Sequence, residues 1–161
     1  MYHFQKQMHK EILVIDDNPD IRLLVSNILK DQNFFVRTAA NYDQAIFEIK
    51  KKLPELAIID IKLDKTDKDG IDILKTITNM SKNIPVIMIS GHATVQIAVE
   101  AIRLGAYEFI EKPFSKEKIL NYVRRALESS ELKKEKDLIE NKLFHSFDLI
   151  GKSPSITRVK K

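Results

Sequence analysis

Polar side chains follow the apolar runs of this sequence, and their types are those that bind phosphate and divalent cations. Asp16 and Asp17 follow ILVI, Asp60 follows LAII, Ser90 follows PVIMI and Lys112 follows YEFIE. Converging carboxylates repel one another, and a hard cation such as Mg²⁺ removes that repulsion while keeping room for water and phosphate oxygens. An ammonium and a hydroxyl supply further contacts to a phosphoryl group, and one carboxylate can act as a nucleophile toward phosphorus.

These residues share a site only if the apolar runs are strands of one parallel sheet. Short β-rich runs alternate with amphipathic helical patterns, which is typical of βαβ units. We predict strands at 12–16, 34–38, 56–60, 85–90 and 107–111. Such sheets bind ligands beyond the carboxyl ends of their strands, where the polar side chains would project.

Five helices are predicted between and after the strands. Asn18 with Pro19, Asn41 and Ser115 are residue types that begin helices, and Gly105 is the type that ends one in the left-handed conformation. From the 3.6-residue spacing, we expect the first two helices to face inward with Ile21, Leu24, Val25, Ile28, Leu29, Ala45, Ile46, Ile49 and Leu53.

The composition excludes several classes of protein. No cysteine is present among the 161 residues, which rules out disulfides, thiolate zinc sites and a cysteine nucleophile. No apolar run is long enough to span a bilayer, and MYHFQKQMHK has no signal core, so we expect a cytoplasmic protein without membrane contact. The net charge of +4 falls mainly in residues 131–161, without a recognition helix, and no binding of nucleic acid by this chain is predicted.

Each polar residue has a plainer interpretation when it is considered alone. An Asp-Asp pair after a strand commonly caps a helix or forms a loop, and Lys-Pro commonly marks a helix boundary. A serine at the end of a strand is usually structural. The functional interpretation therefore depends on all of these residues occurring together, in this order of strands.

Four motifs resemble the response-regulator receiver domain of bacterial two-component systems. They are ILVIDD at 12–17, LAIID at 56–60, PVIMISGHA at 85–93 and EFIEKPF at 108–114. The resemblance covers residues 10 to about 128. It implies an α/β fold, flavodoxin-like (CheY-like), with a doubly wound parallel sheet of five strands in the order 2-1-3-4-5 and a C-terminal helical extension.

The resemblance also implies a role for each polar residue. Asp60 would accept a phosphoryl group from a sensor histidine kinase, and Ser90 and Lys112 would contact it. The implied ligands of Mg²⁺ are Asp16, Asp17, Asp60 and the backbone carbonyl of Lys62. Ser90 and Phe109 would be switch residues, and the Lys112-Pro113 bond would be cis. Such a domain is a phosphoacceptor with self-catalysed transfer and slow autodephosphorylation, not an enzyme in the ordinary sense.

A finer resemblance links the chain to the NtrC-like regulators, and to their NtrX branch. ISGHATVQIAVEAIRLGAYEFIEKPF is similar to that branch almost throughout, and DLIGKSPSI at 148–156 looks like the entry to a sigma-54-activating AAA+ ATPase domain. We therefore expect a disordered tail at 1–9, a receiver at 10–128, a helical linker at 129–147 and the start of a truncated AAA+ domain at 148–161. Asp64 replaces a common proline, and Gly70 lies two residues later than is usual.

The residues leave other functions open. A degenerate or stand-alone receiver would act as an interaction or dimerisation module without phosphorylation. A flavodoxin-like nucleotide binder or small hydrolase is disfavoured, because no glycine-rich phosphate loop follows the first strand. A homodimer is expected through the face of the fourth helix, fifth strand and fifth helix, or through the helical linker.

Overall fold

The computed structural model describes residues 10–63, 69–92 and 94–151. The chain divides into two units, residues 1–127 and residues 128–161, which are considered separately. In the described part of the first unit, strands and helices alternate from β1 to the start of α6. Their bounds are β1 (Glu11–Ile15), α2 (Pro19–Lys30), β2 (Phe35–Ala39), α3 (Tyr42–Lys51), β3 (Leu56–Asp60), α4 (Gly70–Met80), β4 (Val86–Ser90), α5 (Val95–Arg103), β5 (Glu108–Glu111) and α6 (Lys116–Gly151).

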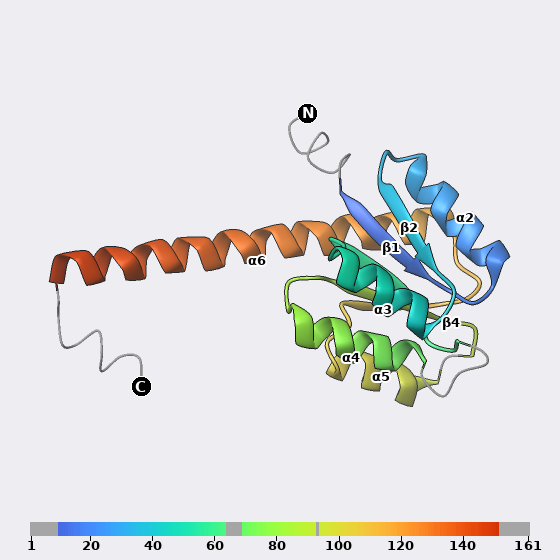
Figure 1. The fold of residues 1–161 in the computed structure, drawn as a ribbon. Helices are drawn as coiled ribbons and strands as arrows, with labels where there is room; N and C mark the ends of the chain where they lie inside the picture. Colours follow the sequence, from blue (N-terminus) through green and yellow to red (C-terminus); the bar gives the residue numbers. More distant parts are fainter. Residues whose placement is uncertain (1–9, 64–68, 93, 152–161) are drawn as a thin grey trace. The chain divides into compact units, whose positions relative to one another are not determined.

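The strands form one parallel sheet in the order β2-β1-β3-β4-β5. The amino ends of the strands therefore lie along one side of the sheet, called the amino edge, and their carboxyl ends lie along the opposite side, called the carboxyl edge. The arrows of β1 and β2 show this common direction (Figure 1). The predicted fold class, strand order and parallel direction are confirmed. The predicted strand limits differ from the observed ones by no more than one residue at either end, and those of β3 are identical.

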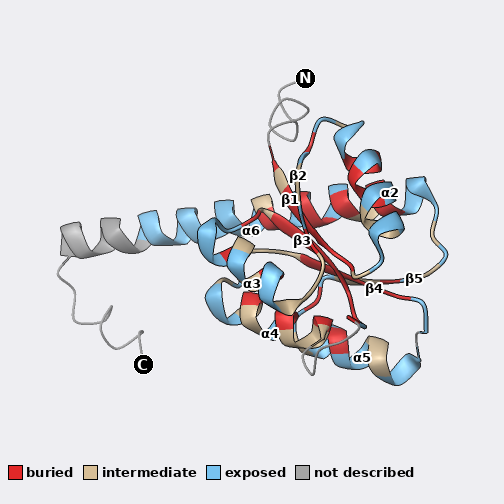
Figure 2. Ribbon diagram, turned by 45° about the vertical axis from the view of Figure 1, so that its right-hand side comes forward, coloured by how far each residue is buried: buried red, intermediate tan, exposed pale blue. Residues whose placement is uncertain are grey.

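Two apolar clusters cover the two faces of the sheet. Because side chains alternate along a strand, Ile12 and Val14 of β1 join one cluster, and Leu13 and Ile15 join the other. The first cluster includes residues from α2 and the first turns of α6, and the second includes residues from α3, α4 and α5. The central strands β1, β3 and β4 are accordingly buried, while the outer strand β2 and the outer sides of the helices are largely exposed (Figure 2). The result is a three-layer α/β/α arrangement.

Side-chain caps fix where the helices begin. The Asn18 side chain accepts hydrogen bonds from the backbone N–H groups of Asp20 and Ile21, with Pro19 as the first residue of α2. Asn41 accepts one from Gln44 N–H, and Ser115 accepts one from Lys118 N–H. Each satisfies a donor that the first turn leaves unpaired. The three predicted caps are thus confirmed.

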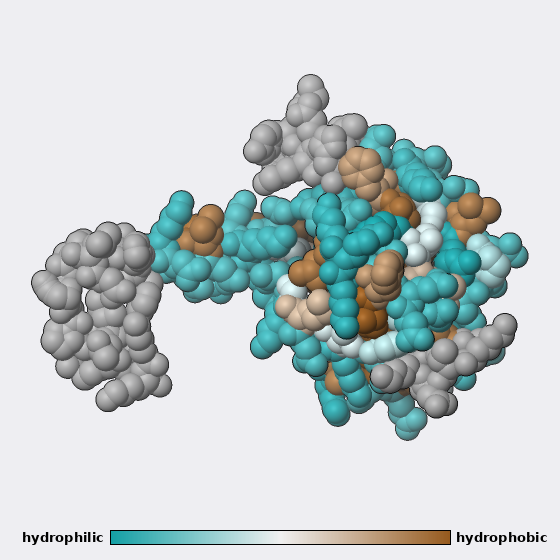
Figure 3. Space-filling view, in the orientation of Figure 1, coloured by the Kyte–Doolittle hydropathy of each residue, from teal (hydrophilic) through white to brown (hydrophobic). Residues whose placement is uncertain are grey.

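Two residues of the expected inward faces are exposed. Leu24 lies on the solvent side of α2, whose buried residues are Val25, Ser26, Ile28 and Leu29. Leu53 follows the end of α3 and is exposed, because that helix stops at Lys51. On the surface that α3 and α4 present in Figure 3, hydrophilic residues likewise predominate, and the hydrophobic side chains lie between them.

The described part of the second unit is the continuation of α6, from residue 128 to residue 151. Leu132, Leu138, Ile139 and Leu143 are exposed there, in a background of charged residues. No helix in the described residues combines the length and apolar character that a membrane crossing requires. The expected disordered tail at 1–9 and most of the expected AAA+ start lie outside the described residues, and the domain limits stay predictions.

Candidate functional site

The end of β1 brings two carboxylates to the carboxyl edge of the sheet. Asp16 is buried, and its N–H donates to the Ala39 carbonyl at 3.2 Å, which continues the pairing of β1 with β2. The Asp16 Oδ1 atom accepts a hydrogen bond from Asn18 N–H at 2.9 Å. Asn18 in turn caps α2, so the start of that helix holds the Asp16–Asp17 turn in place.

Asp60 ends β3 and is also buried, with a relative exposure of 6%. Its Oδ1 atom accepts a hydrogen bond from Lys62 N–H at 3.3 Å. The following residue is held from two sides, because Ile61 N–H donates to the Ile89 carbonyl at 2.9 Å and the Ile61 carbonyl accepts from Gly70 N–H at 2.8 Å. The carboxylate therefore projects from a backbone that β4 and α4 both hold.

Gly70 has a steric reason to be glycine. A Cβ atom at this position would collide with the Asp60 carbonyl oxygen and would lie 2.8 Å from the Ile61 Cα atom. Asp69 caps α4 by accepting from Ile71 N–H, and Asp72 accepts from Asp69 N–H in return. The start of α4 can approach the end of β3 this closely because residue 70 carries no side chain.

Ser90 and Lys112 complete the edge from β4 and β5. Ser90 is buried, and its Oγ accepts from His92 N–H at 3.2 Å. Its carbonyl accepts from Lys112 N–H at 2.8 Å. The Lys112 Nζ atom lies 3.2 Å from Asp16 Oδ2 and 3.3 Å from Asp60 Oδ2, and the Lys112-Pro113 peptide bond is cis. One ammonium thus joins the acids of β1 and β3.

The carboxylates of Asp16, Asp17 and Asp60 each offer an oxygen within 4.8 Å of the others. Burial raises the pKa of Asp60 to about 6, and the neighbouring Asp16 carboxylate adds to this, while Lys112 opposes it. For Lys112, burial lowers the pKa, but Asp60 and Asp16 outweigh it, so the pKa lies above its ordinary value. One lysine therefore only partly compensates the carboxylate charge.

This donor set fits a hard divalent cation. Carboxylate oxygens are the ligands that Mg²⁺ and Ca²⁺ prefer. A cation would offset both causes of the raised pKa of Asp60, which are its burial and, to a smaller extent, the neighbouring Asp16 carboxylate. The cluster lies at the carboxyl edge, where open α/β sheets bind ligands. The residues present can therefore hold a metal ion and an anionic group beside it.

The remaining predicted residues lie around this cluster or behind it. The Lys62 side chain is exposed, while its N–H contacts Asp60. Phe109 is partly buried and packs against the apolar cluster under α3, α4 and α5. Its aromatic ring thus belongs to the core beside β5.

Sequence reasoning missed Arg22, which donates from Nη1 to the Asp16 carbonyl at 2.7 Å. It singled out Gly70 by its position in the loop, but it did not predict that Gly70 admits the start of α4 against β3. The position of Arg22 in the first turns of α2, six residues after Asp16, was the available signal. The close approach at Gly70 depends on how α4 docks, which residue spacing does not reveal.

Comparison with known proteins identifies the family. The model of the response regulator receiver domain matches residues 12–124. The chain belongs to this family. It is 39% identical over 153 residues to the nitrogen assimilation regulatory protein NtrX of Azorhizobium caulinodans, which covers 95% of this chain and 34% of that protein. The chain thus spans about a third of the length of such relatives.

Solved receiver domains have the same fold. The crystal structure of the receiver domain of NtrX from Brucella abortus matches with a TM-score of 0.70 and 45% identity, over 73% of this chain and 98% of that one. The solution structure of the beryllofluoride-activated NtrC4 receiver domain dimer matches with a TM-score of 0.69 and 36% identity, over 74% and 98%. The chain is therefore a receiver domain of the kind found in NtrX- and NtrC-type two-component response regulators.

Proposed function

We propose that Asp60 accepts a phosphoryl group from the phosphohistidine of a sensor kinase. The observation that carries the proposal is the convergence of three carboxylates within 4.8 Å, with Lys112 bonded to two of them. An oxygen of Asp60 forms the bond to phosphorus while the phosphorus–nitrogen bond of the donor breaks, and the imidazole leaves with the electron pair. The product is an acyl phosphate on Asp60.

The residues that would hold Mg²⁺ are Asp16, Asp17, Asp60 and the backbone carbonyl of Lys62. When bound, the ion would offset the negative charge of the carboxylates and of the transferring group. Lys112 already contacts Asp60, so its ammonium is positioned to pair with a phosphoryl oxygen. Ser90, one strand further along the edge, is the hydroxyl donor to another oxygen.

The modified site then changes an interaction surface on the receiver. In our proposal Ser90 moves toward the phosphoryl oxygens, and Phe109 repacks beneath α5. The outer side of α5 and the residue before β5 expose Val95, Val99, Ile102 and Tyr107. We propose that this face and the start of α6 form a homodimer when Asp60 is phosphorylated, as the NtrC4 receiver domain forms a dimer when activated.

We propose that the regulatory output of the protein, control of transcription, resides in domains other than the receiver. Since the relatives are regulators about three times as long as this chain, we propose that the dimer controls transcription through further domains, which residues 148–161 would begin. The helix that follows residue 128 would carry the change in dimer contacts, or would itself dimerise. A cytoplasmic location, shared with a kinase domain that donates the phosphoryl group, stays a prediction.

The test is the intact mass of the chain after incubation with acetyl phosphate and Mg²⁺. We expect an increase equal to one phosphoryl group, which disappears in Asp60→Asn and after chelation of the metal. Asp43→Asn is the matched control, because it removes an exposed carboxylate of α3. A folded wild-type chain that gains no mass would instead favour an interaction module that is not phosphorylated.

A further inference from the structure

Arg22 contacts the site through the backbone. It lies in the first turns of α2 and is partly buried, and its Nη1 atom donates to the Asp16 carbonyl oxygen at 2.7 Å. A hydrogen bond from a charged donor at this distance is among the stronger kinds in proteins. Asn18 already caps α2, so the contact of Arg22 serves the end of β1 rather than the start of its own helix.

The carbonyl that Arg22 binds belongs to the peptide group between Asp16 and Asp17. A peptide group is planar, so fixing its oxygen also fixes the direction in which the chain enters Asp17. The rest of Asp16 is held independently, because its N–H bonds to Ala39 and its carboxylate to Asn18 N–H and Lys112. Arg22 therefore helps to fix the orientation of the peptide group that leads into Asp17.

Arg22 also adds a permanent positive charge beside the carboxylates. Its bond to a backbone oxygen brings that charge close without occupying the Asp16 carboxylate, whose two oxygens receive Asn18 N–H and Lys112. Groups that orient metal ligands in this indirect way commonly change metal affinity when they are removed.

We propose that Arg22 is a positioning residue of the metal and phosphoryl site, which holds the Asp17 carboxylate toward Asp60 by fixing the Asp16–Asp17 peptide group. The proposal rests on the function proposed above, since it concerns the affinity of the same carboxylates for Mg²⁺. It predicts an effect on metal binding that is separate from any effect on folding.

The experiment compares Arg22→Gln and Arg22→Lys with the wild-type chain of 161 residues. Arg124→Gln is the matched control, because it removes an arginine that donates to Gln32 at 2.9 Å, among residues outside the site. Calorimetric titration measures the Mg²⁺ dissociation constant, thermal unfolding monitors the fold, and the rate of labelling by acetyl phosphate is followed against Mg²⁺ concentration.

We expect Arg22→Gln to raise the dissociation constant by about ten-fold. Arg22→Lys should fall between this variant and the wild type, because an ammonium keeps the charge and can donate to one oxygen. Saturating Mg²⁺ should return the labelling rate of Arg22→Gln toward the wild-type rate. A purely structural role would lower the unfolding temperature and leave the dissociation constant of the folded protein unchanged.

An Arg22→Gln chain that is folded and binds Mg²⁺ as tightly as Arg124→Gln would overturn the proposal. If Arg22→Gln does not fold, Arg22→Lys decides, and an unchanged dissociation constant in that variant overturns it equally. A wild-type chain that binds no Mg²⁺ and takes no phosphoryl group would instead refute the proposed function. If the wild-type chain binds Mg²⁺ and takes the phosphoryl group, and Arg22→Gln binds Mg²⁺ with the same dissociation constant, only the proposed role of Arg22 is refuted.

Discussion

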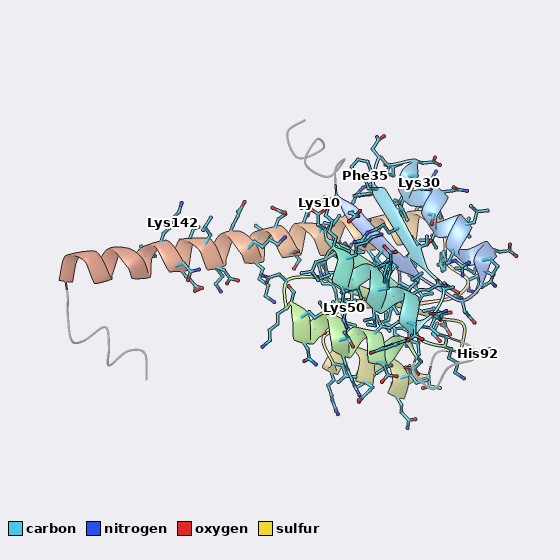
Figure 4. The ribbon with its side chains drawn as sticks, viewed as in Figure 1. Lys10, Lys30, Phe35, Lys50, His92 and Lys142 are labelled. Carbon is cyan, nitrogen blue, oxygen red and sulfur yellow. The ribbon has the colours of Figure 1, made fainter. Side chains whose placement is uncertain are left out.

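The two edges of the sheet carry similar charged residues in different arrangements. Figure 4 labels Lys10 near the edge where β1 begins and His92 near the edge where the strands end. At the amino edge, Arg37 lies 3.1 Å from Glu11 and 3.0 Å from Glu48, and Lys10 lies 3.6 Å from Glu55. At the carboxyl edge, the described cluster sets Lys112 against three carboxylates.

The difference separates a structural network from a candidate binding site. Arg37 also donates to the carbonyls of Glu48 and Lys52 at the end of α3, so its guanidinium ties β2, β1 and that helix together. The amino edge therefore pairs its charges within the fold, although Glu11 Oε1 and Arg37 Nε are buried there without a hydrogen-bond partner among the described residues. At the carboxyl edge, burial and the neighbouring Asp16 carboxylate raise the pKa of Asp60, so the ionised carboxylate costs stability there.

The largest effect should come from removing a proposed metal ligand at the carboxyl edge. Asp17→Asn takes away a carboxylate and its charge, so we expect Mg²⁺ affinity to fall by at least about 100-fold, with little loss of stability. Calorimetric titration measures the affinity, beside Asp43→Asn as a control. Retained affinity in Asp17→Asn would mean that this edge does not hold the metal in the way proposed.

A substitution at the amino edge should lower stability and leave Mg²⁺ affinity unchanged. Arg37→Gln leaves Glu11 and Glu48 without the guanidinium that they share, and it removes two bonds to carbonyls at the end of α3, those of Glu48 and Lys52. The Arg37 side chain is only 16% exposed. We expect a loss of about 2–3 kcal/mol in the free energy of unfolding, with unchanged Mg²⁺ affinity. Urea unfolding and calorimetric titration measure the two quantities. If Arg37→Gln were as stable as the wild type but bound Mg²⁺ more weakly, the amino edge would contribute to metal binding, and the proposed contrast between the two edges would be wrong.

A smaller effect should appear as a dependence on pH. The pKa of Asp60 is raised from 3.8 to about 6 in the folded chain, so the folded state binds this proton more tightly than the unfolded state does. The ionised carboxylate therefore costs stability progressively as pH rises from about 4 to 6, and the full cost applies above that range. Asp60→Asn avoids this cost.

Without metal, Asp60→Asn should thus be more stable than the wild type by about 1–2 kcal/mol at pH 7.5. The advantage should shrink on acidification and vanish below the unfolded pKa of 3.8, where the wild-type carboxyl is protonated in both states. Urea unfolding in a chelating buffer across this range measures the difference. A constant difference at all pH values would show that Asp60 does not carry the cost of the carboxylate cluster.

Much of the fold could be predicted because its determinants are local. Asn18, Asn41 and Ser115 cap helices through neighbours two or three residues away. Gly105 has the left-handed φ of 113° that its position after α5 suggested. The convergence at the carboxyl edge follows from parallel strands, since each polar residue comes at or just after the end of its strand.

The remaining features depend on distances that the sequence does not contain. Periodicity identifies an amphipathic helix, but it does not fix how the helix is rotated, and so Leu24 faces solvent instead of the core. Arg37 meets partners 26 and 11 residues away, Glu11 and Glu48, only because β1, β2 and α3 pack together. The bond from Arg22 to Asp16 likewise depends on the path of the turn between β1 and α2.

The close docking of α4 on β3 has a consequence for engineering. Ile61 is tied to β4 through its N–H and to Gly70 through its carbonyl, so both ends of the segment that follows β3 are anchored. Additional residues between Leu63 and Asp69 need not alter the span between those anchors, and closing a longer loop costs little. A reporter peptide could therefore be inserted between these two positions while the anchors keep the geometry of the carboxylates.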